Sequence, residues 1–202
     1  MKILLVGAKG QLGKQILNII NSGKSELGEV PEEILKSEVS GVDVDELDIV
    51  DLQKVREYIT KASPDVVINC AAYTNVDGCE SHKDLAFKVN ALGARNLAMV
   101  SEEVDAKLIH VSTDYVFSGV GTTPLDECDL PAPVSAYGTT KLAGEEFVRS
   151  LSSKYFIVRT AWLYGYFGKN FVYTIMNAAK QRGRLTVVND QKGNPTNAED
   201  LA

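Results

Sequence analysis

Positive charge is scarce in this chain of 202 residues, which has 21 lysines and arginines against 27 aspartates and glutamates. The formal net charge of −6 argues against a protein that coats the phosphates of a nucleic acid. The lysines and arginines are also scattered along the sequence and form no basic cluster. We therefore expect no nucleic-acid partner.

Histidines, cysteines and long apolar runs are few as well. The two histidines, His82 and His110, lack the spacing of zinc ligands, so the sequence predicts no metal centre. The three cysteines are an odd number without paired spacing, which favours a reduced cytoplasmic protein over a disulfide framework. The first apolar run, residues 3–6, leads directly into glycines and is neither a signal peptide nor a transmembrane helix. We expect a cytoplasmic chain with no membrane partner.

Short apolar runs alternate with longer helical patterns, which is typical of βαβ units around a parallel sheet. The runs predict strands at residues 2–7, 39–44, 65–70, 107–112, 155–159 and 185–188. Helices are expected at residues 11–22, 51–62, 86–100, 135–151 and 170–181, with a loop or short helix at 23–37 and a further helix starting near 198. Most runs are apolar on both faces, as strands covered on two sides are. The pattern predicts an α/β protein with a doubly wound parallel sheet.

The first predicted strand ends in a glycine-rich turn, residues 7–13, with the sequence GAKGQLG. Glycines permit a tight turn and a close approach to a pyrophosphate, and the helix that follows offers free N–H groups and partial positive charge. An ATP-binding P-loop would need glycine at position 8 and serine or threonine at 15, where the chain has Ala8 and Gln15. The place of the glycine turn between a strand and a helix favours a Rossmann-like dinucleotide site over a plain cluster of turn glycines.

An acidic stretch follows the second predicted strand, where the adenosine ribose of a dinucleotide would lie. A carboxylate there accepts hydrogen bonds from the ribose hydroxyls and repels a 2′-phosphate, so Asp43 favours NADH over NADPH. The alternative is that Asp43 only starts a solvated acidic loop, because Asp45, Glu46 and Asp48 surround it.

Tyr137 and Lys141 are four residues apart in a predicted helix, so both side chains lie on one face. A phenol titrates near pH ~10, and a nearby ammonium lowers that pKa towards the working range of an enzyme. The hydroxyl of Thr113, at the end of the fourth predicted strand, can hold a substrate carbonyl against Tyr137. YxxxK alone arises by chance and a lone helical tyrosine is usually packing, but the combination with Thr113 and the glycine turn favours catalysis.

These features together resemble the extended short-chain dehydrogenase/reductase family. Within it the chain is similar to the dTDP-4-dehydrorhamnose reductases in several segments that follow in order: residues 10–13 (GQLG), 71–77 (AAYTNVD), 112–117 (STDYVF), 137–145 (YGTTKLAGE), 159–164 (RTAWLY) and 189–196 (NDQKGNPT). The resemblance implies NAD(P)H-dependent reduction of the 4-keto group of dTDP-4-dehydro-β-L-rhamnose to dTDP-L-rhamnose. Some members of the family use Mg²⁺, which no motif here indicates.

The resemblance also implies a role for individual residues. The catalytic set would be Thr113, Tyr137 and Lys141, with Tyr137 protonating the oxygen as hydride arrives from the nicotinamide. The implied cofactor contacts are Gly7, Gly10, Gln11, Leu12, Asp43, Asp48, Ile49, Ala71, Ala72, Tyr73, Thr74, Tyr137 and Lys141. The implied substrate contacts are Thr113, Asp114 and Trp162. Two alternatives stay open, since Trp162 could fill the core and Asp114 could cap a loop. Many relatives carry histidine where this chain has Tyr73.

The expected domains are a dinucleotide-binding Rossmann-like domain at residues 1–160 and the start of a smaller substrate domain at 161–202. Because members of the family are longer, we expect this second domain to be incomplete. The expected partner is a dTDP-sugar, and a homodimer is a further expectation. The alternatives to a reductase are a nucleotide-sugar epimerase or dehydratase of the same superfamily, or a non-catalytic regulatory subunit that binds the cofactor.

Overall fold

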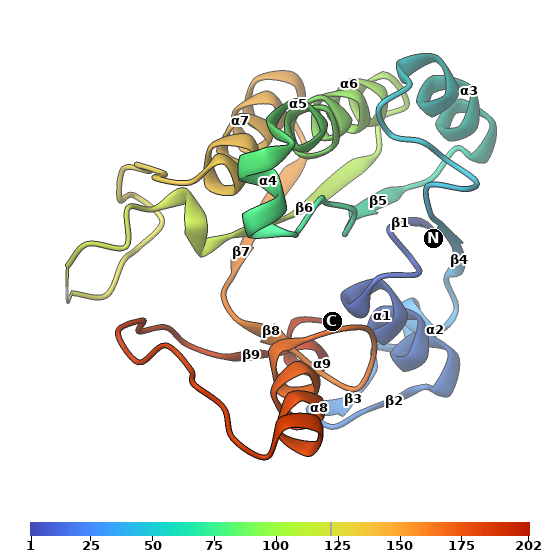
Figure 1. The fold of residues 1–202 in the computed structure, drawn as a ribbon. Helices are drawn as coiled ribbons and strands as arrows, with labels where there is room; N and C mark the ends of the chain where they lie inside the picture. Colours follow the sequence, from blue (N-terminus) through green and yellow to red (C-terminus); the bar gives the residue numbers. More distant parts are fainter. Residues whose placement is uncertain (122) are drawn as a thin grey trace.

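A five-stranded parallel sheet forms the centre of the computed structural model, which describes residues 1–121 and 123–202 (Figure 1). From edge to edge the strands are β4 (Glu38–Val42), β1 (Lys2–Val6), β5 (Val66–Asn69), β6 (Lys107–Thr113) and β7 (Tyr155–Thr160). The chain leaves β1 for β4 on one side and returns to β5 on the other, with Leu4 opposite Ser40 and Val67. The strand order therefore reverses at β1, where α/β proteins bind their ligands.

Helices cover both faces of the sheet, as the doubly wound prediction requires (Figure 1). One face carries α1 (Gln11–Ser22); the opposite face carries α3 (Leu52–Ala62), α6 (Ala94–Glu103) and α7 (Ala136–Leu151). This follows from right-handed crossovers, because the connections to β4 and to β5 run in opposite directions across the sheet. The predicted fold class is confirmed.

The main core lies between the sheet and the helices α3, α6 and α7. Strand residues such as Leu4, Val67 and Leu108 pack there against Ile59 and Leu97. A smaller cluster under α1 joins Leu5 and Ala8 to Leu12 and Ile16. Burying these apolar side chains on both faces stabilises the sheet and holds the carboxyl ends of its strands in a fixed position.

Side-chain caps set where several helices begin. Asp51 accepts hydrogen bonds from the backbone N–H groups of Gln53 and Lys54 at the start of α3, as predicted. Ser135 does the same for Gly138 at the start of α7. The predicted helix at 86–100 belongs to a longer helical stretch made of α5 (Lys83–Phe87), a π-helical segment (Lys88–Gly93) and α6. It is preceded by the short helix α4 (Val76–Ser81).

One expectation about local structure is wrong, and two others hold only in part. Residues 185–188 form no strand; Val188 is 68% exposed, and an apolar run stays a strand only where a neighbour pairs with its backbone. Residues 23–37 contain, besides the short helix α2 (Glu32–Leu35), a hairpin of β2 (Lys24–Ser25) and β3 (Gly28–Glu29). The edge strand β4 is largely exposed, so it is not covered on both faces.

The last forty residues form a small unit beyond the main sheet. It contains β8 (Leu163–Tyr164), α8 (Phe171–Arg182), β9 (Thr196–Asn197) and α9 (Ala198–Leu201), and β8 pairs with β9. The helices α8 and α9 confirm the two helical expectations for this region, and α9 packs on α1. Among the described residues, none of the helices combines the length and apolarity needed to cross a bilayer.

Candidate active site

The glycine turn is pressed against the end of β5. Gly7 has a φ of +82°, and a methyl group on it would lie 2.7 Å from the backbone nitrogen of Ala71. A methyl group on Gly13 would overlap the carbonyl oxygen of Gly7. No side chain caps the start of α1 within the described residues, so its first N–H groups are free to bind an anion. The residues present therefore fit a pyrophosphate.

A cleft of about 460 Å³ opens beside this turn, at the carboxyl ends of β1, β4 and β5. Most of the predicted cofactor residues line it: Gly7, Gly10, Asp43, Asp48, Ile49, Ala71, Ala72 and Tyr73. Four of the lining residues that sequence reasoning missed are Lys9, Val44, Leu47 and Val89. The structure thus brings the glycine turn, the acidic stretch and the loop after β5 to one place.

The remaining predicted cofactor residues do not line this cleft. Gln11 begins α1, and the side chain of Leu12 is buried in the core under that helix, which leaves only its backbone to face a ligand. Thr74 is exposed in the loop after β5. Tyr137 and Lys141 belong to the catalytic set on α7.

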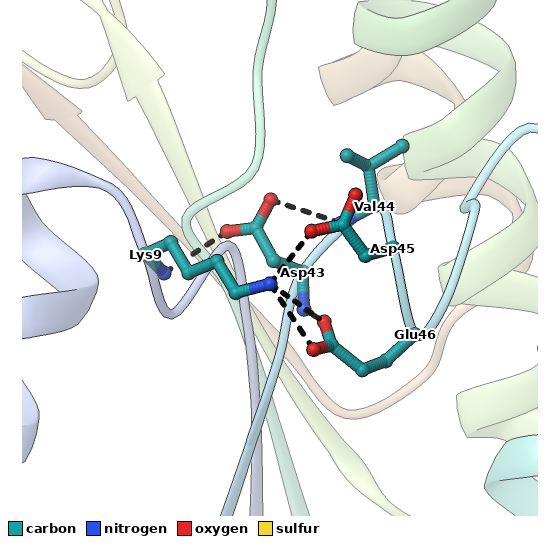
Figure 2. Close-up of polar contacts among 5 residues, drawn as sticks. All are labelled: Lys9, Asp43, Val44, Asp45 and Glu46. Atoms are coloured by element: carbon teal, nitrogen blue, oxygen red, sulfur yellow. Dashed lines mark hydrogen bonds and ion pairs between the residues drawn. The ribbon is translucent and has the colours of Figure 1, made fainter.

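Asp43 has both carboxylate oxygens engaged by backbone groups (Figure 2). Oδ2 accepts from the N–H of Lys9 and Oδ1 from the N–H of Val44, each at 2.9 Å. The ammonium of Lys9 donates to Asp45 Oδ2 at 2.8 Å and to Glu46 Oε1 at 3.1 Å. These bonds raise the pKa of Lys9 and lower the pKa values of Asp45 and Glu46. The glycine turn is therefore tied to the acidic stretch, and Asp43 is more than a solvated loop residue.

Tyr137 and Lys141 lie one turn apart on α7 and are 9% and 2% exposed, so neither is a surface residue. The ring of Tyr115 contacts that of Tyr137 edge-on, with centroids 5.5 Å apart. Thr113 ends β6, and its hydroxyl donates to Asp114 Oδ1 at 3.0 Å. The structure thus brings the candidate catalytic residues and Asp114 together near the carboxyl end of β6.

The pKa of the phenol departs from expectation. Burial raises the pKa of Tyr137 to about 12, which outweighs the lowering by its hydrogen bond with Thr113. The ammonium of Lys141 donates to the carbonyl oxygen of Val111 at 2.7 Å. The predicted lowering of the Tyr137 pKa by Lys141 is therefore wrong for this arrangement, because desolvation dominates.

A buried carboxylate lies behind Lys141. Glu145 follows it by one turn of α7 and is fully buried, and Arg159 of β7 holds it with Nε at 2.9 Å and Nη2 at 2.6 Å. Burial alone would raise the pKa of Glu145, but the hydrogen bonds and charge of Arg159 hold it below its usual value. Burial lowers the pKa of Lys141 to about 8, and the charge of Glu145 opposes that shift. Glu145 is thus the ionised counter-charge of Lys141.

Asn90 joins the cleft to the catalytic helix. Its amide oxygen accepts from the N–H of Tyr73 at 2.8 Å, and its amide nitrogen donates to the carbonyl of Tyr73 and to Thr140 Oγ1. Tyr73 also packs in one apolar cluster with Tyr137. The loop that lines the cleft is therefore fixed against the helix that carries Tyr137 and Lys141.

Known proteins match the sequence along the whole chain. A family model described as the RmlD substrate binding domain matches residues 1–202. The chain belongs to this family. It is 41% identical to the dTDP-4-dehydrorhamnose reductase of Shigella flexneri, over 100% of this chain and 64% of the relative. The resemblance seen in the sequence is thereby confirmed.

Two solved structures of the family are close in fold. A dTDP-4-dehydrorhamnose reductase of Clostridium acetobutylicum is 48% identical with a TM-score of 0.90, over 100% of this chain and 67% of that one. The enzyme of Bacillus anthracis, solved in complex with NADP, is 44% identical with a TM-score of 0.89, over 99% of this chain and 67% of that one. The chain spans about two thirds of the length of these relatives.

Trp162, in the segment RTAWLY, lies at the surface and not in the core. Trp162 is 46% exposed, has a φ of +48° and covers Gly193, where a methyl group would come within 2.8 Å of the indole. The core-filling alternative is therefore wrong. No group of His, Cys, Asp or Glu side chains in the described part of the chain could hold a metal ion.

Sequence reasoning missed the roles of Lys9, Asn90, Glu145 and Arg159 in this site. Asn90 could have been noticed, since it is a polar residue between apolar neighbours, Val89 and Ala91, in the π-helical segment. The others are charged side chains whose partners come from distant parts of the chain.

Proposed function

We propose that the chain provides the cofactor cleft and the proton donor of an NAD(P)H-dependent oxidoreductase. Its substrate would be dTDP-4-dehydro-β-L-rhamnose, whose 4-keto group is reduced to give dTDP-L-rhamnose. The observation that carries the proposal is the placement of Tyr137, Lys141 and Thr113 at the end of the sheet, joined through Asn90 and Tyr73 to a glycine-turn cleft. The relatives named dTDP-4-dehydrorhamnose reductase support the choice of substrate.

Each residue has a defined task in this reaction. When bound in the cleft, a reduced nicotinamide would supply the hydride for the carbonyl carbon. Thr113 and Tyr137 hold the carbonyl oxygen by hydrogen bonds, and the phenol passes its proton to that oxygen as the C=O bond is reduced. The phenolate left on Tyr137 then takes a proton from solvent, and the ammonium of Lys141, held by the Val111 carbonyl, would bind the nicotinamide ribose. Asp114 and Trp162 would line the sugar.

The proposed cofactor preference is for NADH. Asp43 lines the cleft with a carboxylate held by two backbone N–H groups, and its charge would repel a 2′-phosphate. Each of its oxygens still has lone pairs for the ribose hydroxyls. Gly7, Gly10, Gln11 and Leu12 would contact the pyrophosphate, and Asp48 and Ile49 the adenosine. Ala71, Ala72, Tyr73 and Thr74 would contact the middle of the cofactor, and Lys141 its nicotinamide ribose.

We also propose that residues 1–160 form the dinucleotide domain and residues 161–202 belong to the substrate domain. The main sheet ends with Thr160, and β8 and β9 pair only with each other.

A cytoplasmic location is proposed because all three cysteines, Cys70, Cys79 and Cys128, are free thiols. The expected homodimer stays a prediction that sedimentation would test.

The test is an absorbance assay at the nicotinamide band with dTDP-4-dehydrorhamnose and either cofactor. We expect net NADH consumption, and a loss of about a hundredfold or more in rate with Tyr137→Phe while cofactor binding is kept. Tightly held cofactor without net consumption would favour an epimerase or dehydratase. A chain that binds cofactor and shows no rate with or without Tyr137 would favour the regulatory subunit.

A further inference from the structure

Lys9 is the one basic side chain that lines the cleft, among its described lining residues. Its backbone N–H is bonded to Asp43, while its ammonium lies between Asp45 and Glu46 (Figure 2). The side chains are 55% exposed for Lys9, 74% for Asp45 and 49% for Glu46. Ion pairs as exposed as this are weak and screened by salt, so the ammonium can exchange one anionic partner for another.

A dinucleotide whose pyrophosphate lies at the start of α1 carries its adenosine ribose to the end of β4, beside Asp43. A 2′-phosphate on that ribose would enter the group formed by Lys9, Asp43, Asp45 and Glu46. This group has three carboxylates and one ammonium, and the ammonium is already shared by two of the carboxylates. A 2′-phosphate would therefore meet net negative charge unless the Lys9 ammonium left its partners and bound it.

We propose that Lys9 determines cofactor specificity and that Asp45 and Glu46 control its availability to the 2′-phosphate of NADPH. While both carboxylates hold the ammonium, NADH is favoured because Asp43 receives the ribose hydroxyls. When their charge is removed, Lys9 is free to pair with the phosphate and NADPH binds better. Asp43 is then only part of the selection. This inference rests on the proposed dinucleotide binding.

The experiment measures dissociation constants of NADH and NADPH by nicotinamide fluorescence, independently of any turnover. The test variant is Asp45→Asn/Glu46→Gln, which keeps hydrogen-bond acceptors and removes two charges. We expect the affinity ratio to move towards NADPH by roughly fivefold or more at low salt, and the gain to shrink at high salt. Adding Lys9→Met to this variant should abolish the gain.

Two controls keep the result interpretable. Glu32→Gln/Glu33→Gln removes the same charge from α2, which does not line the cleft, and should leave the ratio unchanged. Asp45→Asn alone should give part of the effect if the double variant folds poorly, because among the described residues the Asp45 carboxylate hydrogen-bonds only to the Lys9 ammonium.

The outcomes separate the two proposals. If the unmodified chain binds neither nucleotide, the proposed function fails. If both nucleotides bind but neutralising Asp45 and Glu46 leaves their ratio unchanged, the inference fails and the proposed function stands. The inference also fails if Lys9→Met in the neutralised variant keeps the gained NADPH affinity.

Discussion

A single buried carboxylate keeps the ammonium of the catalytic helix charged. Lys141 is enclosed by Glu145 on its own helix, by Cys70 at the end of β5 and by His110 and the Val111 carbonyl of β6. Burial raises the pKa of Cys70 to about 12 and lowers that of His110, so both are neutral near pH 7. The charge state of Lys141 therefore depends on Glu145.

The first prediction concerns Glu145→Gln. Removing the negative charge should lower the pKa of Lys141 further below about 8, so that the ammonium deprotonates at lower pH. The fall in reduction rate on the basic side should then move down by roughly one pH unit or more. A pH profile of kcat measures this. Glu146→Gln, which neutralises the exposed neighbouring carboxylate, is the control; an equal shift there would contradict the role of Glu145.

A second residue-scale prediction concerns Gly7. In Gly7→Ala the new methyl group would require a left-handed φ and would also overlap the backbone of Ala71. Gly183→Ala is the matched control, because Gly183 has a φ of +70° with open space around it. The control should lose roughly 1–2 kcal/mol of unfolding free energy, the cost of the left-handed φ alone. Urea denaturation should show a clearly larger loss for Gly7→Ala, and equal losses would contradict the close approach.

At the scale of elements, the first turn of α7 decides where the phenol lies. Ser135 accepts a hydrogen bond from the backbone N–H of Gly138 and fixes the start of the helix two residues before Tyr137. A methyl group on Gly138 would overlap the carbonyl oxygen of Tyr115, so this turn is also pressed onto the segment after β6. The cap and the contact together set the position of Tyr137 against Thr113.

The third prediction is that Ser135→Ala lowers the free energy of unfolding by about 1 kcal/mol, because one N–H group at the helix start loses its partner. The reduction rate should fall as well, since the turn that carries Tyr137 loosens. Ser135→Asp should restore stability, because aspartate also caps helices. Chemical denaturation of the three proteins makes the comparison. A Ser135→Ala protein as stable as the parent would show that the cap is dispensable.

At the scale of the whole molecule, the site joins segments that lie far apart in the chain. The turn after β1, the ends of β4 and β5, and the helix after β6 all meet at the carboxyl edge of one sheet (Figure 1). A ligand that contacts all of them should stabilise the folded state as a unit.

The fourth prediction is that NADH at a hundred times its dissociation constant raises the free energy of unfolding by about 2.7 kcal/mol. A thermal melt with and without NADH measures the shift in Tm. AMP, which contacts only the adenosine part, should raise Tm less at equal concentration. If NADH left Tm unchanged at every concentration, the cleft would not be a dinucleotide site.

Features that depend on neighbouring residues could be predicted from the sequence. The glycine turn between β1 and α1, the Asp51 cap and the shared face of Tyr137 and Lys141 were all predicted, because turns, caps and helix faces are set within a few residues. The alternation of strands and helices also predicted the doubly wound sheet, since right-handed crossovers leave few arrangements.

Contacts between distant groups became known only from the folded structure. The pairing of β8 with β9, the ion pair of Glu145 with Arg159 and the contact of Lys9 with Asp45 join residues that no local pattern links. The run at 185–188 is apolar enough for a strand, but the described part of the chain offers it no partner strand. Strand pairing, burial of charge and the pKa of a buried group depend on what the rest of the chain packs around them, and that is settled only when the chain folds.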